Sequence, residues 1–120
     1  LAELFGIAEG DNTPEGRCQM TRQLFDHLDV DLLVVHPVAY ALAVTEDETV
    51  WVPGPFVEKP VITTGAGDHF NAGFCLGQLL GFTPTMSLNL GVSSSGHYVR
   101  SGKSPSINDL EALLREWPSR

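Results

Sequence analysis

A glycine-rich turn between an extended segment and a helix constrains this chain more than any other feature of its sequence. Thr63-Thr64-Gly65-Ala66-Gly67-Asp68 follows the β-branched pair Val61-Ile62, and the small and apolar residues after it predict a helix over 67–80. A tight turn that opens a helix directs its free amides toward one point, at the positive end of the helix dipole. The turn therefore predicts a site for a negatively charged group.

The residue types in this turn suit phosphoryl transfer. Gly65 and Gly67 carry no side chain that would keep a phosphoryl group from the amides, and Asp68 adds a carboxylate in the first helical turn. A hydroxyl could pass its proton to this carboxylate while the amides of Gly65, Ala66 and Gly67 form an anion hole for the phosphoryl oxygens. An ordinary tight turn with an acidic helix start is the alternative that spacing alone leaves open.

Two other glycine motifs fit the sequence less well. A dinucleotide fingerprint, G-x-G-x-x-G, would need glycine where Phe70 stands. Gly102-Lys103-Ser104 matches the end of a Walker A loop, but the leading glycine would fall at His97, with Gly96 one residue out of register. Neither motif offers a better phosphate site than the 63–68 turn.

The segment before the turn predicts a helix followed by strands. Thr13-Pro14 is a helix start, and an apolar face suited to packing on a sheet runs from there to about Leu28. The nearly continuous apolar run 30–35 predicts a strand covered on both faces. Two further short runs, 41–44 and 50–52, flank a polar loop and predict a β-hairpin.

The segment after the turn predicts three helices. Gly73 and Gly77 would let the helix over 67–80 approach a neighbour closely, and Gly81 should end it. Thr83-Pro84 starts a second helix, which Gly102 and Pro105 end. The last helix has a capping box at Ser106 to Asp109 and an apolar stripe that consists of Ile107, Leu110, Leu114 and Trp117. The expected fold class is α/β, a sheet with helices on both faces.

Composition excludes several kinds of partner. The 120 residues carry a net charge of −8 with only seven Lys and Arg, which gives no basic stripe for nucleic acid and no patch for an anionic membrane. No run of apolar residues is long enough for a membrane span. Cys18 and Cys75 have no metal or redox spacing and are expected to be buried thiols in a reducing compartment, so we expect a cytoplasmic protein.

Residues 61–74, Val-Ile-Thr-Thr-Gly-Ala-Gly-Asp-His-Phe-Asn-Ala-Gly-Phe, resemble the C-terminal signature of the ribokinase-like (PfkB) carbohydrate kinases, D-T-x-G-A-G-D followed by a small, apolar helix. Residues 99–102 are similar to the family's late V-x-x-G segment. Members are considerably longer than this chain. The resemblance therefore implies the C-terminal nucleotide-binding and catalytic portion, 1–120, of a three-layer ribokinase-like fold, without the N-terminal sugar-binding half; the helix-tail character of the first residues agrees.

The resemblance also implies functional roles. Asp68 would be the base for a hydroxyl of a sugar or sugar-like alcohol, with ATP and Mg²⁺ as cosubstrate and metal, and the chain by itself could be inactive. Nucleotide contacts would involve the turn and the segment that borders the adenine pocket, namely Thr64, Asn89, Ser93 and Gly102. No residue of the chain is assigned as a metal ligand. The choice of sugar and the formation of a homodimer stay open.

Two departures from the family pattern affect the surroundings of the turn. Ile62 stands where the signature has its leading Asp, and an Ile side chain offers no oxygen to a cation site, so we expect little or no activation by potassium. The segment 36–41 stands where many relatives have a T-x-G-x-x-G loop at the nucleotide phosphates. Val38 and Ala41 cannot adopt positive φ as readily as glycine, so the nucleotide is expected to bind differently or more weakly.

The remaining candidates receive no site. His69, next to the proposed base, is expected to be exposed, and His27, His36 and His97 have no metal-ligand spacing. Asn71, one turn after Asp68, could face the site or a neighbouring strand. Two functions follow: phosphorylation of a sugar by ATP, and, as the alternative, a non-catalytic nucleotide-binding or regulatory subunit of the same fold.

Overall fold

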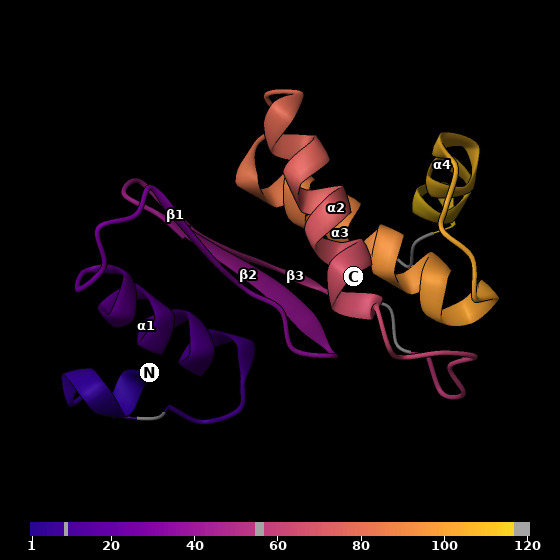
Figure 1. Cartoon of the computed structure of the whole chain (residues 1–120). Helices are drawn as coiled ribbons and strands as arrows, with labels where there is room; N and C mark the ends of the chain where they lie inside the picture. The colour runs from indigo at the N-terminus through magenta and orange to yellow at the C-terminus, as the bar shows by residue number, and fades with distance from the viewer. Residues whose placement is uncertain (9, 55–56, 117–120) are drawn as a thin grey trace.

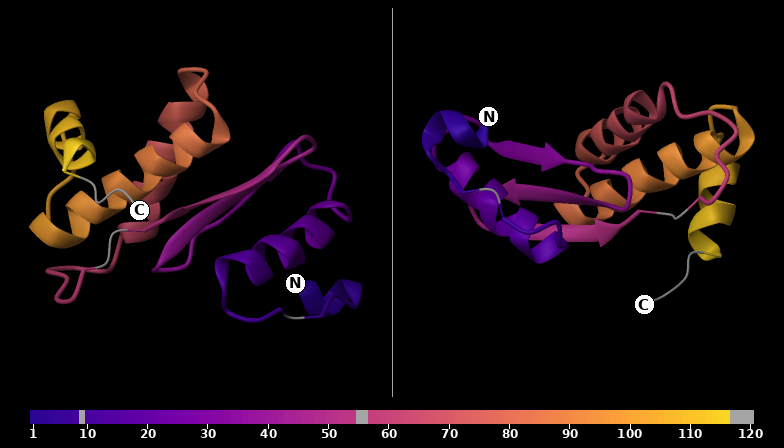
Figure 2. Two further views of the ribbon diagram at one scale, coloured as in Figure 1. Left: turned by 180° about the vertical axis from the view of Figure 1, so that it is seen from behind. Right: turned by 90° about the horizontal axis from the view of Figure 1, so that it is seen from below.

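The chain folds into three layers with a sheet in the middle (Figure 1). The computed structural model describes residues 1–8, 10–54 and 57–116. Its elements are the 3-10 helix η1 (Ala2–Phe5), α1 (Pro14–Phe25), β1 (Leu32–Val35), β2 (Tyr40–Thr45), β3 (Thr49–Pro53), α2 (Ala66–Leu79), α3 (Pro84–Ser101) and α4 (Ile107–Arg115). Helix α1 covers one face of the sheet, and α2 with α3 lies on the other face (Figure 2). The predicted α/β class with helices on both faces and a β-hairpin is confirmed.

The sheet has three antiparallel strands in the order β1-β2-β3. Strand β2 is central, and each residue from Tyr40 to Val44 is buried because the strand is covered on both faces. Its odd-numbered residues, Ala41 and Ala43, pack toward α2 and α3, whereas Tyr40 and its even-numbered neighbours pack toward α1. The hairpin prediction is correct, with a connecting loop of residues 46–48, and the strand predicted over 30–35 is shorter.

Helices α2 and α3 pack through glycine. A Cβ at Gly73 would lie 2.6 Å from the Leu90 carbonyl oxygen and 2.4 Å from Ser94 Oγ, both on α3. A Cβ at Gly77 would lie 2.9 Å from Ser87 Cα on the same helix. Because these distances leave no space for a methyl group, the two backbones touch directly, as the glycine spacing predicts.

The caps expected from the sequence are present. Thr13 accepts a hydrogen bond from the Gly16 amide, and Thr83 accepts one from the Met86 amide. Ser106 and Asp109 form the predicted capping box, in which the hydrogen bonds from the Ser106 backbone and side chain lower the pKa of Asp109. Local sequence therefore determines where these helices begin.

The expectation that both cysteines are buried was wrong. Cys75 is exposed on α2, whereas Cys18 is half-buried, and burial raises the pKa of its thiol. Of the three described residues of the α4 stripe, Leu110 alone is buried, because α3 is the only described element that this helix contacts; Ile107 is 68% exposed. Trp117, the last residue of the stripe, lies outside the described residues. Within the described ranges, no helix has the length and apolar character that crossing a membrane requires.

The contact between α2 and α3 predicts a large effect of one methyl group. Gly73→Ala should destabilise the protein by roughly 1–3 kcal/mol, since the new Cβ meets the Leu90 backbone, which cannot rotate away. In this chain by itself, Cys75→Ala, an exposed change on the same helix, should alter stability by less than about 0.5 kcal/mol. Urea unfolding of both variants measures the difference, and equal stability of the two would show that the helices do not pack this closely.

Candidate functional site

The glycine-rich turn forms the start of α2. Gly65 is the N-cap residue with φ +92° and ψ −1°, a backbone conformation that side-chain-bearing residues rarely adopt. Asp68 lies in the first turn and is exposed, as are Thr63 and Thr64. The carboxylate of Asp68 is therefore accessible at the end of the helix where free amides gather.

The amides of the turn differ in their partners. The Ala66 amide donates to the Thr63 carbonyl at 3.1 Å, so within the proposed anion hole it would have to share or exchange this bond. The extended segment before the turn is tied to α3, because the Val61 amide donates to the Val99 carbonyl at 2.7 Å. Gly102 ends α3 beside this segment, since a Cβ at Gly102 would lie 3.5 Å from Val61 Cγ1. The structure thus brings Thr64 and Gly102 to the same end of α3 as the turn.

Three side chains that were not predicted as part of the site, His69, Tyr98 and Ser104, form contacts around the turn. The His69 ring stacks on Tyr98 with ring centroids 3.7 Å apart. Its Nδ1 lies 2.8 Å from the Gly65 carbonyl oxygen and its Nε2 2.8 Å from Ser104 Oγ. The Tyr98 hydroxyl donates to the Thr64 carbonyl at 2.9 Å. His69 is half-buried, so the expectation that it is exposed was wrong; the contacts with Tyr98 and Ser104 arise from residues about 30 positions away.

The segment 36–41 reaches the turn through His36. The His36 ring stacks on Phe70 of α2 at 4.2 Å, and a Cβ at Gly67 would lie 3.5 Å from His36 Cε1. Ala41, where a glycine of the family loop would fall, is a fully buried residue of β2. Among the described residues, only glycines have positive φ, so this segment connects its strands with ordinary backbone.

Two predicted nucleotide contacts lie far from the turn. Helical rise separates Asn89 from Gly102 by roughly 20 Å and Ser93 from Gly102 by roughly 14 Å. Ser93 is fully buried, and its hydroxyl donates to the Leu90 carbonyl at 3.0 Å, so it offers nothing to a ligand in this conformation. Asn89 is half-buried, and Asn71 is exposed rather than packed on a strand.

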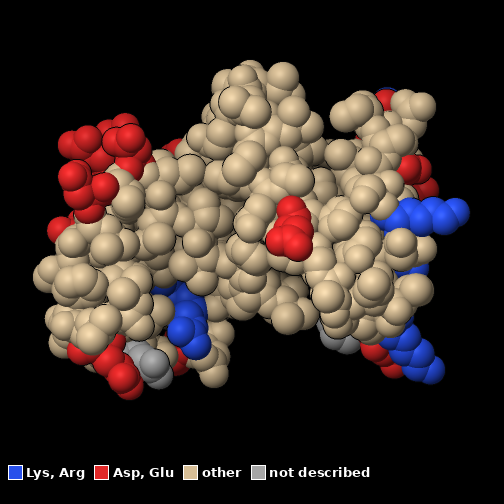
Figure 3. Space-filling view, in the orientation of Figure 1, with Lys and Arg blue, Asp and Glu red and all other residues tan. Residues whose placement is uncertain are grey.

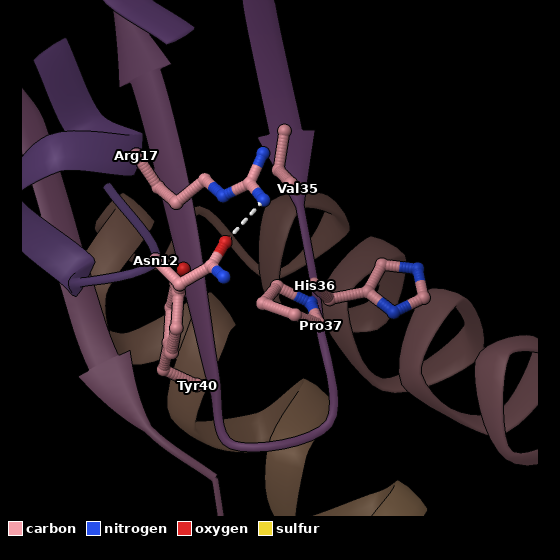
Figure 4. Close-up of a pocket in the computed structure, with 6 residues that line it drawn as sticks. All are labelled: Asn12, Arg17, Val35, His36, Pro37 and Tyr40. Carbon is pink, nitrogen blue, oxygen red and sulfur yellow. Dashed lines mark hydrogen bonds between the residues drawn. The ribbon is translucent and has the colours of Figure 1, made fainter. Parts of the chain in front are cut away.

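A cavity of about 430 Å³ lies beside β1 and α1 (Figure 4). Its lining includes Arg17, whose guanidinium donates to Asn12 Oδ1 at 2.7 Å, and Tyr40. His36 also lines it, but Figure 4 shows its ring directed away from Arg17 and Asn12. The cavity therefore borders the 36–41 segment and does not include the glycine turn.

Few charged side chains lie over the helix that the turn opens. Figure 3 shows a largely uncharged surface over α2 apart from one acidic side chain, with acidic side chains over the hairpin end of the sheet and basic ones at the right, below α4. Across 1–8, 10–54 and 57–116, no three His, Cys, Asp or Glu side chains are grouped so that they could bind a metal ion. The amides at the start of α2 and the dipole of this helix are available to an anion at the turn.

Comparisons with known proteins agree with the fold. The ketohexokinase of Haloferax volcanii is 38% identical over 113 residues, which are 94% of this chain and 29% of that protein. Among solved structures, the ribokinase of Thermotoga maritima superposes with a TM-score of 0.69 at 26% identity over 80% of this chain and 34% of its own. Arabidopsis thaliana ribokinase, solved with ribose and ATP, gives a TM-score of 0.74 at 20% identity over 89% and 36%.

The fold and the relatives are those of the PfkB-like carbohydrate kinases. The model of the prokaryotic ketohexokinase family matches residues 1–117, and the chain belongs to that family. It spans about a third of the length of the relatives that it matches.

Two glycines with positive φ allow a test of whether the turn requires a left-handed backbone conformation at Gly65. Gly65→Ala and Gly81→Ala should each lower the free energy of unfolding by about 1–2 kcal/mol, since both positions have left-handed backbone. Only at Gly65 would the new Cβ crowd a neighbour, the Tyr98 hydroxyl at 3.2 Å. We therefore expect Gly65→Ala alone to change the near-ultraviolet circular dichroism of the tyrosines. Unchanged stability of Gly65→Ala would contradict the positive φ at this residue.

Proposed function

We propose that the full-length protein transfers the γ-phosphoryl group of ATP to a hydroxyl of a ketohexose, with this chain supplying the turn at which transfer occurs. The observation that carries this proposal is the Gly65 turn, with φ +92°, which opens the 14-residue helix α2 beside the exposed carboxylate of Asp68. Amides that can donate hydrogen bonds to an anion and a carboxylate that can accept a proton lie within one helical turn. Phosphoryl transfer to an alcohol requires both kinds of group.

The reaction is a displacement at phosphorus. The sugar hydroxyl oxygen forms a bond to the γ-phosphorus while the bond from that phosphorus to the bridging oxygen of ADP breaks. Asp68 accepts the proton of the hydroxyl, and the amides of Gly65, Ala66 and Gly67 stabilise the charge on the phosphoryl oxygens. For the Ala66 amide this requires that the hydrogen bond to Thr63 be shared with the phosphoryl group or released.

The proposed substrate class is supported by the similarity to the ketohexokinase of Haloferax volcanii. At 38% identity over nearly the whole chain, the two proteins are expected to share the phosphoryl-transfer machinery. ATP as the phosphoryl donor is supported by the ribokinase of Arabidopsis, which was solved with ribose and ATP. Mg²⁺ is supported by the structure of a ribokinase II from Escherichia coli, which was solved with ATP and Mg²⁺. Since magnesium in kinases is bound largely by nucleotide phosphates, a cage of protein carboxylates is not required here.

The surroundings of the turn qualify the proposal in two ways. Ile62 gives no oxygen to a monovalent cation, so potassium is not expected to raise the rate. The 36–41 segment has no glycine and no residue with positive φ. The nucleotide phosphates would therefore be bound mainly by groups at the start of α2. Thr64 and Gly102 remain the proposed nucleotide contacts near the turn, whereas the buried Ser93 is not supported.

We further propose that this chain forms the C-terminal portion of the kinase and that α2 packs against the rest of it. Helix α2 and its end present an apolar surface that consists of Ala72, Cys75, Leu76, Leu79 and Leu80, all exposed in this chain. Leu79 is 86% exposed. A stripe of this kind at positions i, i+3, i+4 and i+7 is typical of a helix face covered in the complete protein.

Replacing the proposed base tests the function most simply. In the full-length protein, Asp68→Asn should lower kcat for phosphorylation of D-fructose by about 10²–10⁴, because the general base is lost. Calorimetry should find ATP affinity within a few-fold of the original. Glu58→Gln, an exposed carboxylate change elsewhere, is the control with unchanged turnover. Near-normal turnover by Asp68→Asn would refute the assignment, and ATP binding without phosphorylation of any sugar by the original protein would favour the regulatory alternative.

A charge on the α2 surface tests the domain proposal. Leu79→Lys in the full-length protein should cost more than about 2 kcal/mol, because an ammonium group would be buried without a partner. Gln23→Lys, an exposed helical change on α1, should be close to neutral. Equal thermal midpoints for the two variants would mean that nothing covers the α2 surface.

A further inference from the structure

His69 contacts both the glycine turn at the start of α2 and the segment that follows α3. Its ring nitrogens lie 2.8 Å from the Gly65 carbonyl oxygen in the turn and 2.8 Å from Ser104 Oγ in the segment after α3. Its ring also lies flat on Tyr98, with an interplanar angle of 12°. One imidazole therefore links the start of α2 to the end of α3.

The partners determine which ring nitrogen carries hydrogen. A carbonyl oxygen can only accept, so Nδ1–H donates to Gly65. In the neutral ring, Nε2 then accepts from the Ser104 hydroxyl; in the protonated ring, Nε2–H donates to the same oxygen. Because both nitrogens are engaged within the protein, His69 is available neither as a base for a substrate nor as a metal ligand.

These hydrogen bonds orient the amides of the glycine turn. In a planar trans peptide, the carbonyl and the following amide point in opposite directions, so fixing one fixes the other. The Gly65 carbonyl accepts from both Nδ1 and the backbone amide of His69, at 2.8 and 3.1 Å, and this sets the direction of the Ala66 amide, which would share its hydrogen bond to the Thr63 carbonyl with an anion. The Tyr98 hydroxyl fixes the Thr64 carbonyl at 2.9 Å in the same way, and this sets the direction of the Gly65 amide.

We propose that His69 is a positioning residue for phosphoryl transfer: with Tyr98 and Ser104 it fixes the peptides whose amides meet the transferring phosphoryl group. The inference rests on the proposed function, because the amides need this orientation only if an anion binds there. A positioning residue of this kind acts on the transition state, where a displacement of about 1 Å can cost roughly 100-fold in rate. It should therefore affect kcat more than the KM for the sugar.

The test uses the full-length protein with ATP and D-fructose. His69→Phe keeps a ring that can stack on Tyr98 and removes both hydrogen bonds, so kcat should fall about 10- to 100-fold while the KM for fructose stays within about threefold. His69→Asn places an amide donor near the position of Nδ1 and should recover most of the lost kcat. Ser104→Ala removes the other partner of the ring at an exposed site, and we expect a fall in kcat of about 3- to 10-fold.

Three results would overturn the inference. They are normal kcat in His69→Phe, equal losses in His69→Phe and His69→Asn, and a rise in the KM for fructose without a change in kcat. If His69→Phe does not fold, Ser104→Ala with normal kcat is the contradicting result. Measuring Asp68→Asn in the same assay separates the two proposals. Normal turnover by Asp68→Asn would refute the proposed function and this inference with it. Normal turnover by His69→Phe together with an inactive Asp68→Asn would refute this inference alone.

Discussion

Direct backbone contact between α2 and α3 is the constraint on which the rest of this structure depends. At Gly73 the two helices are so close that a Cβ would lie 2.6 Å from the Leu90 carbonyl oxygen. The same helix pair places Phe70 and Leu88 against the buried alanines of β2, so the core of the sheet and the helix contact are formed together. Because α2 begins at the glycine turn and α3 ends beside it, the packing that stabilises the fold also determines where the turn stands.

The fold could be predicted from the sequence where local chemistry decides. Thr13, Thr83 and Ser106 cap helices because their hydroxyl groups reach amides two or three residues ahead, which no distant residue can change. The hairpin was predicted from two short apolar runs and the polar loop between them. Burial was less predictable, because it depends on what covers an element: Cys75 and Ile107 are apolar at regular helical spacing and yet lie on surfaces that no described element covers.

The candidate site shows the same division. The Gly65 turn and Asp68 are adjacent in sequence, so the start of α2 and its accessible carboxylate could be predicted. The contacts of His69 could not be predicted, because Tyr98 and Ser104 reach it only after α2 and α3 have packed. The burial of Ser93, which was predicted as a nucleotide contact, has a related reason, since the α3 face that carries it is covered. The sequence therefore predicts the turn and its carboxylate, and tertiary packing determines which neighbours contact them.

The central claim is that the amides of the turn meet the transferring phosphoryl group beside Asp68. A crystal structure of the full-length protein with ADP, aluminium fluoride and D-fructose, a mimic of the transition state, tests it most directly. The account predicts the fluoride ligands within about 3 Å of the Gly65 and Gly67 amide nitrogens, and a fructose hydroxyl at a similar distance from the Asp68 carboxylate. A metal fluoride bound elsewhere, with the turn and Asp68 free of ligand, would contradict it.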